Sequence, residues 1–135
     1  MTLRSLLLLA AVLQLGIAAL NLFLIRLLKW EADLARAPLL LREVFHVHAW
    51  FISLTLAIFA VLTLRFSQQM AHSTDIIASW LAAAIAVFWA IRTILQITYY
   101  SSSHWRGQPA RTMIHIALLL LYGGFAAAYG IAAWR

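Results

Sequence analysis

The residues of this chain with the widest chemical repertoire are its histidines. His46 and His48 form a His-x-His pair, and His115 lies near the other end of the chain. Imidazole nitrogens are common ligands of haem iron and of divalent metal ions. On an α-helix, residues two apart point about 200° apart, so this pair can share one ion only on an extended backbone. One of the two combined with His115 is an easier pair of ligands. The alternative is that these are interfacial histidines that form hydrogen bonds with the backbone or with lipid headgroups.

A second polar group surrounds Arg92. Arg92, Gln96, Tyr99 and Tyr100 fall at i, i+4, i+7 and i+8, which is one face of a helix, and Trp89 joins that face at i−3. An arginine deep in an apolar helix costs about 2.5–3.5 kcal/mol on insertion scales, so it is a functional candidate. The alternative is that Arg92 extends to lipid phosphates and backbone carbonyls near the membrane surface.

Two further positions, Asn21 and Arg111, lie near the ends of other apolar runs. An asparagine in lipid more often joins helices than binds a ligand. The predicted ligand-binding residues are Asn21, Arg92, Gln96, Tyr99, Tyr100 and Arg111, and the predicted metal ligands are His46, His48 and His115.

The composition is that of a chain surrounded by lipid. Of its 135 residues, 65% are hydrophobic and 10% are charged, against roughly 25% charged in ordinary globular proteins. The net charge of +6 does not indicate nucleic acid here, because the basic residues lie at the ends of apolar runs, where they act as topology signals and contact lipid headgroups. The absence of cysteine excludes disulfides and thiolate metal sites.

Four apolar runs predict four transmembrane helices, at about residues 3–28, 44–64, 76–100 and 112–134. Each run is long enough to cross a hydrocarbon core of about 30 Å. The first run is too long for the apolar core of a signal peptide. We therefore predict an all-α integral membrane protein, an up-down four-helix bundle that forms a single membrane domain over residues 1–135.

The connections carry their own signals. A short interfacial helix is expected at Glu31–Ala37, ending before Pro38. Residues 65–75 read as a polar turn, in which Ser73 or Thr74 caps the next helix and Asp75 lies in its first turn. Pro109 suits the entry to the last helix.

Charge counting gives a topology. The side that holds the connections 29–43 and 101–111 is richer in Lys and Arg, which places both connections in the cytoplasm. The expected location of the protein is the cell membrane, in particular a bacterial inner membrane. A basic site on the outer face would give the same count. The basic residues on the richer side are Arg26, Lys29, Arg36, Arg42, Arg106 and Arg111, and those on the other are Arg4, Arg65 and Arg135.

The alternating helices bring the polar residues to one side of the membrane. His46 follows Arg42 by four residues, and His115 follows Arg111 by four, so both lie about 6 Å inside their boundary at helical rise. Gln96 is equally deep, and Arg92 lies about 12 Å in. This agreement predicts a one-sided polar pocket for haem, a divalent metal, a quinone or an anionic lipid.

Two other classes of function compete with a binding pocket. No catalytic or phosphate-binding motif occurs, which favours a non-catalytic accessory or scaffold subunit whose polar layer serves helix packing and lipid contacts. Small residues over Gly123–Gly130 offer a face for a neighbouring helix, in the same chain or in a homo- or hetero-oligomer. A transporter is the weakest alternative, because no acidic residue lies mid-membrane.

Overall fold

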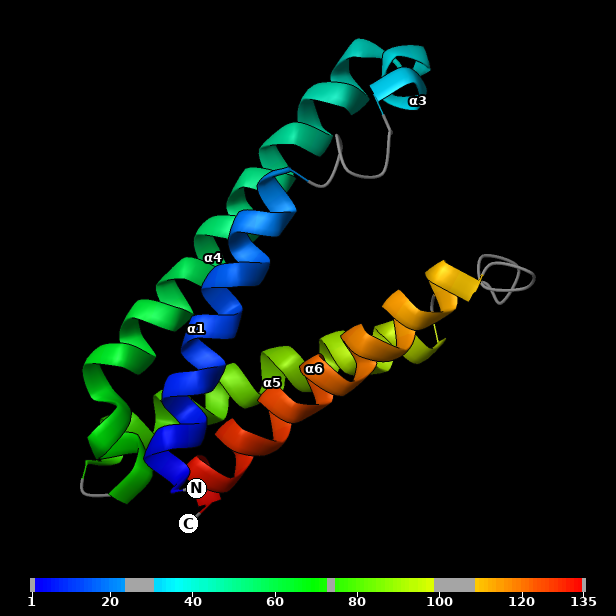
Figure 1. Cartoon of the computed structure of the whole chain (residues 1–135). Coiled ribbons are helices and arrows are strands. Elements are labelled where there is room, and N and C mark those ends of the chain that lie inside the picture. The colour runs from blue at the N-terminus through cyan, green and yellow to red at the C-terminus, as the bar shows by residue number, and fades with distance from the viewer. Residues whose placement is uncertain (1, 24–30, 73–74, 99–108, 135) are drawn as a thin grey trace. The chain divides into compact units, whose positions relative to one another are not determined.

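The computed structural model describes residues 2–23, 31–72, 75–98 and 109–134, with Arg111 described by its backbone alone. These residues form helices and short connections, without a strand. The helices are α1 (Leu3–Leu22), α3 (Glu31–Arg36), α4 (Leu39–His72), α5 (Ile76–Thr98) and α6 (Pro109–Trp134) (Figure 1).

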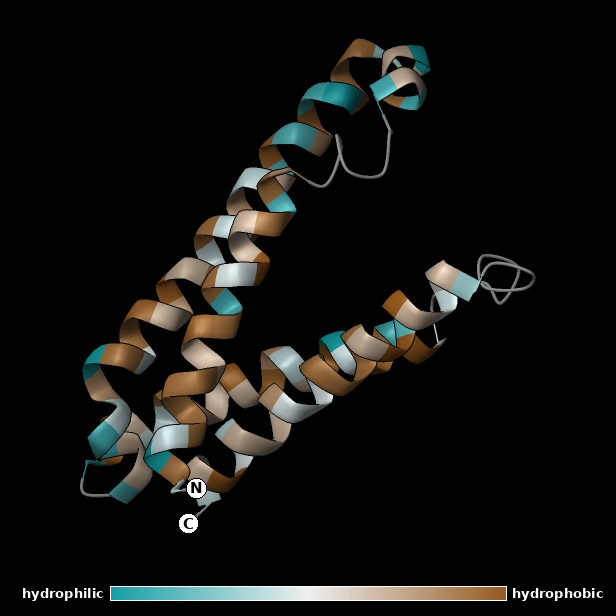
Figure 2. Ribbon diagram, viewed as in Figure 1, coloured by the Kyte–Doolittle hydropathy of each residue, from teal (hydrophilic) through white to brown (hydrophobic). Residues whose placement is uncertain are grey.

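Four of these helices are long and apolar enough to cross a membrane: α1, α4, α5 and the part of α6 from Thr112. The predicted all-α fold class with four membrane-spanning helices is therefore confirmed, and the chain is a membrane protein. Figure 2 shows that apolar residues predominate along these four helices, whereas α3 and the first turns of α4 carry several hydrophilic residues.

The chain divides into two compact units. The α1–α4 unit comprises Leu8–Arg65, and the α5–α6 unit comprises Phe66–Arg135 together with Met1–Leu7. Within each unit, two long helices lie side by side and run in opposite directions (Figure 1). The apolar faces that these pairs leave exposed are suited to contact with lipid.

The second predicted helix, 44–64, is wrong in length, because α4 begins at Leu39 and ends at His72. Pro38 stands just before its first turn and accepts a hydrogen bond from the Arg42 amide at 3.0 Å, so the proline permits a helix start there. The predicted polar turn after residue 64 is also helical as far as His72. Gln, Met, Ala and Arg are all good helix formers, so the polarity of this segment marks the end of the apolar run and not the end of the helix.

One irregularity interrupts α4. Phe66 has non-helical dihedral angles (φ −114°, ψ 17°), and it is the residue at which the two units divide. Beyond it, Ser67, Met70 and Ala71 are buried. Their i, i+3, i+4 spacing gives this polar extension one packed face.

The other helix boundaries agree more closely with the sequence. The short helix after residue 30 is confirmed as α3, and α6 begins at Pro109 as expected. Asp75 precedes α5 and caps it, because its carboxylate accepts the Ile77 amide at 2.9 Å, whereas the sequence placed this carboxylate in the first turn. The predicted caps Ser73 and Thr74, and the predicted helical residues 24–28 and 99–100, lie outside the described residues.

Candidate functional site

The polar residues of the α5–α6 unit meet where α5 ends and α6 begins. The side-chain amide nitrogen of Gln96 lies 2.9 Å from Nδ1 of His115. Gln96 is only 4% exposed, while His115 is half-buried. A buried amide in a membrane has no water to bond to, so its partner must be a protein group. The two residues thus form a polar bridge between the helices.

Arg92 lies one helical turn deeper than Gln96 on the same face of α5. Its guanidinium carbon is 5.4 Å from the centre of the Tyr122 ring on α6, within the range of a cation–π contact. Arg92 is half-buried. Through this contact the guanidinium packs against α6. Arg92 itself is six residues before the end of α5 at Thr98.

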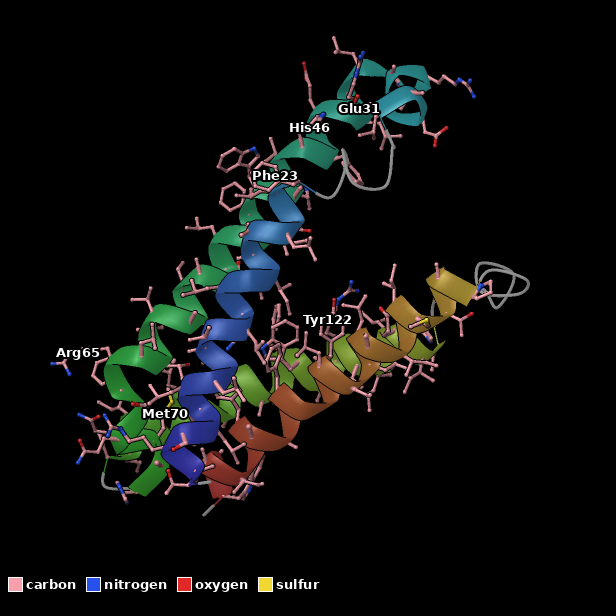
Figure 3. The ribbon with its side chains drawn as sticks, in the orientation of Figure 1. Phe23, Glu31, His46, Arg65, Met70 and Tyr122 are labelled. Atoms are coloured by element: carbon pink, nitrogen blue, oxygen red, sulfur yellow. The ribbon has the colours of Figure 1, made fainter. Side chains whose placement is uncertain are left out.

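An aromatic cluster lies next to these polar groups, one helical turn farther from the α5–α6 connection. Trp89 is 2% exposed, and its ring stacks on Tyr122 at a centroid distance of 5.1 Å and meets Phe125 at 4.8 Å. Figure 3 shows Tyr122 on the α6 ribbon. The predicted face of Trp89, Arg92 and Gln96 is therefore the face that contacts α6, because a period of three to four residues returns each side chain to the same side of the helix.

The pairings also fix the register of the two helices. Gln96 lies level with His115, and Trp89 lies between the levels of Tyr122 and Phe125. His115 is then about 9 Å along α6 from Pro109 at helical rise. Arg92, Gln96 and His115 consequently occupy one short stretch of the helix pair.

Asn21 belongs to the other unit, and its described bonds are made within the protein. Its amide nitrogen lies 2.9 Å from both the Ala49 carbonyl and the Ser53 hydroxyl of α4. The Ser53 hydroxyl in turn donates to the Ala18 carbonyl of α1 at 3.0 Å. These bonds join α1 to α4, which is the packing role that an intramembrane asparagine commonly has.

The histidines of α4 lie beyond this junction. Asn21 is level with Ala49, so residues 39–48 extend about 15 Å past that level at helical rise. His46, labelled in Figure 3, and His48 are both exposed on this extension. The His48 Nδ1 nitrogen lies 3.0 Å from the Val44 carbonyl of its own helix.

The backbone at His46 and His48 is helical, so the extended conformation that a shared ion requires is not present there. Among residues 2–23, 31–72, 75–98 and 109–134, no group of three or more His, Asp or Glu could hold a metal ion. The pair formed by His46 and His115 joins residues of different units, and it stays a prediction. Tyr99, Tyr100 and the side chain of Arg111 lie outside the described residues.

Two participants were missing from the predicted set. Ser53 accepts a hydrogen bond from Asn21, and the Tyr122 ring makes the cation–π contact with Arg92. Tyr122 had a usable signal, since it follows His115 by seven residues and therefore shares its helix face. Ser53 had none, because a lone serine in an apolar helix is equally compatible with a bond to its own backbone.

Comparisons of this chain with protein-family models, with curated proteins and with solved structures find no match.

Proposed function

We propose that this membrane protein binds a lipid-phase ligand whose head carries hydrogen-bond-accepting oxygens, either a quinone or an anionic lipid. The observation that carries the proposal is the Gln96–His115 bridge beside the Arg92 guanidinium, all within one short stretch of α5 and α6. These residues combine a cation, an imidazole and an aromatic wall. Tyr99, Tyr100 and Arg111 are proposed to complete the site.

Charge supports an oxygen-rich ligand. The segment 76–134 contains no Asp or Glu, while Arg92 and Arg111 lie in its two helices. A positive charge in a low-dielectric setting attracts anions and the negative ends of carbonyl dipoles more strongly than it would in water. A bound phosphate or quinone oxygen would offset part of the cost of placing Arg92 inside the membrane.

The haem and metal versions of the site have less support. His115 is the single histidine of α5 and α6, and its Nδ1 is already held by Gln96. Axial haem ligation would require the other imidazole nitrogen to be unprotonated. An absorption spectrum of the purified protein tests this version, because a bound haem produces an intense Soret band.

The ligand is tested by what copurifies in mild detergent. We expect mass spectrometry of the extracted lipids to find a quinone or an anionic lipid in near-stoichiometric amount in the wild-type protein and to find it depleted in Arg92→Gln. Arg65→Gln is the matched control, since Arg65 is an exposed arginine of the α1–α4 unit (Figure 3). Equal lipid content in all three proteins, each with normal thermal unfolding, would contradict the proposal.

A non-catalytic accessory or scaffold role is the second candidate. The Asn21–Ser53 network favours it, because that network places intramembrane polar groups in helix packing. In this case Arg92→Gln leaves the lipid complement unchanged, and it lowers the yield of a partner recovered by cross-linking in native membranes. Unchanged stability, lipid content and cross-linked partners would exclude this role as well.

The setting proposed for either role is a bacterial inner membrane, with the connections 29–43 and 101–111 in the cytoplasm. The excess of Lys and Arg on that side supports the orientation.

A further inference from the structure

The bond between Gln96 and His115 determines which nitrogen of the imidazole carries the proton. The amide nitrogen of Gln96 faces His115 Nδ1 at 2.9 Å. An amide nitrogen only donates, so Nδ1 must accept and must be unprotonated. In the neutral ring the proton is then on Nε2.

His48 has the opposite arrangement in the same chain. Its Nδ1 lies 3.0 Å from the Val44 carbonyl oxygen, and a carbonyl oxygen only accepts. Nδ1 of His48 must therefore carry a proton. His48 is thus an internal reference for the tautomer protonated on Nδ1, with which His115 can be compared.

We infer that Gln96 fixes His115 as a hydrogen-bond donor through Nε2, and that the site thereby selects ligands by their acceptor oxygens. This inference rests on the proposed function for the identity of the site. Gln96 is a positioning residue here, since it acts on the ligand through the imidazole. On binding, a ligand oxygen accepts a hydrogen bond from the Nε2–H group of His115.

Arg92 strengthens the same selection. A guanidinium has five N–H donors and no acceptor, and Arg92 lies one turn from Gln96 on the face that contacts α6. Two donor groups about one helical turn apart favour a head that accepts hydrogen bonds without needing to donate any. A quinone carbonyl and a lipid phosphate share this chemistry. A metal ion does not, because it requires a nitrogen lone pair, and in this tautomer the Nδ1 lone pair accepts the Gln96 amide while Nε2 carries the proton.

The tautomers are measured by 15N NMR of histidine-labelled protein in phosphatidylcholine nanodiscs, at about pH 8, where free imidazole is neutral. Protonated and unprotonated ring nitrogens have widely separated 15N shifts, and His115→Asn identifies the His115 signals. We expect a protonated Nε2 in His115 and a protonated Nδ1 in His48. Gln96→Glu should move the His115 proton to Nδ1, because a carboxylate only accepts.

Ligand class is measured on the same samples with two probes. Decyl-ubiquinone added to phosphatidylcholine nanodiscs tests a quinone, and replacement of part of the lipid by phosphatidylglycerol tests a phosphate. We expect one probe to shift the His115 Nε2 resonance. Gln96→Glu should weaken the affinity for that probe roughly tenfold, because a tenfold change in Kd corresponds to the free energy of about one hydrogen bond. The probe that acts identifies the source of the oxygen.

The possible failures are distinct. A wild-type His115 protonated on Nδ1 overturns the inference, even if Arg92 still binds a lipid. A wild-type His115 protonated on Nε2 that responds to neither probe overturns the ligand class and the proposed function, but it leaves the role of Gln96 in setting the tautomer intact. If Gln96→Glu does not fold, the wild-type spectrum and the two titrations still decide both questions.

Discussion

Asn21 on α1 and Ser53 on α4 are directly joined, with the Asn21 amide nitrogen 2.9 Å from the Ser53 hydroxyl oxygen. The same nitrogen bonds to the Ala49 carbonyl, and the Ser53 hydroxyl donates to the Ala18 carbonyl. Both hydrogens of the amide and the one hydrogen of the hydroxyl are therefore used between the helices. Because lipid offers no substitute partners, this network holds α1 and α4 in one register.

Removal of this network should show coupling between its two members. We expect Asn21→Leu and Ser53→Ala each to lower the free energy of unfolding by about 1 kcal/mol, with an interaction energy of about 0.6–1.7 kcal/mol in a double-mutant cycle. The measurement is reversible unfolding in mixed detergent micelles. Thr55→Val is the control, since the Thr55 hydroxyl bonds within its own helix to Phe51. Strict additivity of the two substitutions would argue against the bond.

Two tryptophans of α5 should respond very differently to truncation. Trp89 is 2% exposed and packs on Tyr122 and Phe125, whereas Trp80 is 72% exposed. We expect Trp89→Ala to cost about 3–5 kcal/mol of stability, because it leaves a cavity in the α5–α6 contact. Trp80→Ala should cost less than about 1 kcal/mol, since lipid fills the space. Similar losses for both variants would contradict the burial of Trp89.

The glycines of α6 should tolerate a methyl group. A Cβ atom added at Gly123, Gly124 or Gly130 meets nothing within 4 Å, so these residues are not required for close packing among the described residues. We expect Gly124→Ala to stabilise the monomer by about 0.5–1 kcal/mol through helix propensity. Gly16→Ala, at an equally open position of α1, should raise the stability by a similar amount.

The open glycines also leave the proposed oligomer testable. If a homo- or hetero-oligomer forms through Gly123–Gly130, the small residues serve a partner helix and not the chain's own fold. We expect Gly124→Leu to abolish cross-linked oligomers while the monomer unfolds as the wild type does. Oligomers that survive this substitution would place the partner elsewhere.

Topology can be read with single cysteines, because the native chain has none. Ala35 in α3 and Gln68 near the end of α4 are both exposed. From the proposed orientation we expect Gln68→Cys to react with an impermeant maleimide in intact cells, and Ala35→Cys to react only after the membrane is opened. The reverse pattern would place the connections 29–43 and 101–111 outside.

The length of α4 shows where sequence patterns stop being informative. Arg65, Gln68 and Gln69 interrupt the apolar run, and hydropathy alone predicts a turn there. The helix continues because none of these residues breaks it, and Ser67 and Met70 find buried positions on one side. Hydropathy reports which residues lipid can cover, but it does not report where backbone hydrogen bonding ends.

By itself, the sequence determined the class of the protein and the faces of its helices. Four apolar runs require four membrane-length helices, because an unpaired backbone cannot remain in lipid. The face that carries Trp89, Arg92 and Gln96 followed from the helical period alone. Both conclusions depend only on local properties of the chain.

Only the tertiary structure decided which polar groups meet. Asn21 and Gln96 looked equivalent in the sequence, as single amides in apolar helices. Asn21 bonds to Ser53 and to backbone carbonyls, whereas Gln96 bonds to a histidine whose chemistry it can set. The difference arises from the register between paired helices, since a shift of one residue rotates a side chain by about 100° and moves it 1.5 Å along the axis.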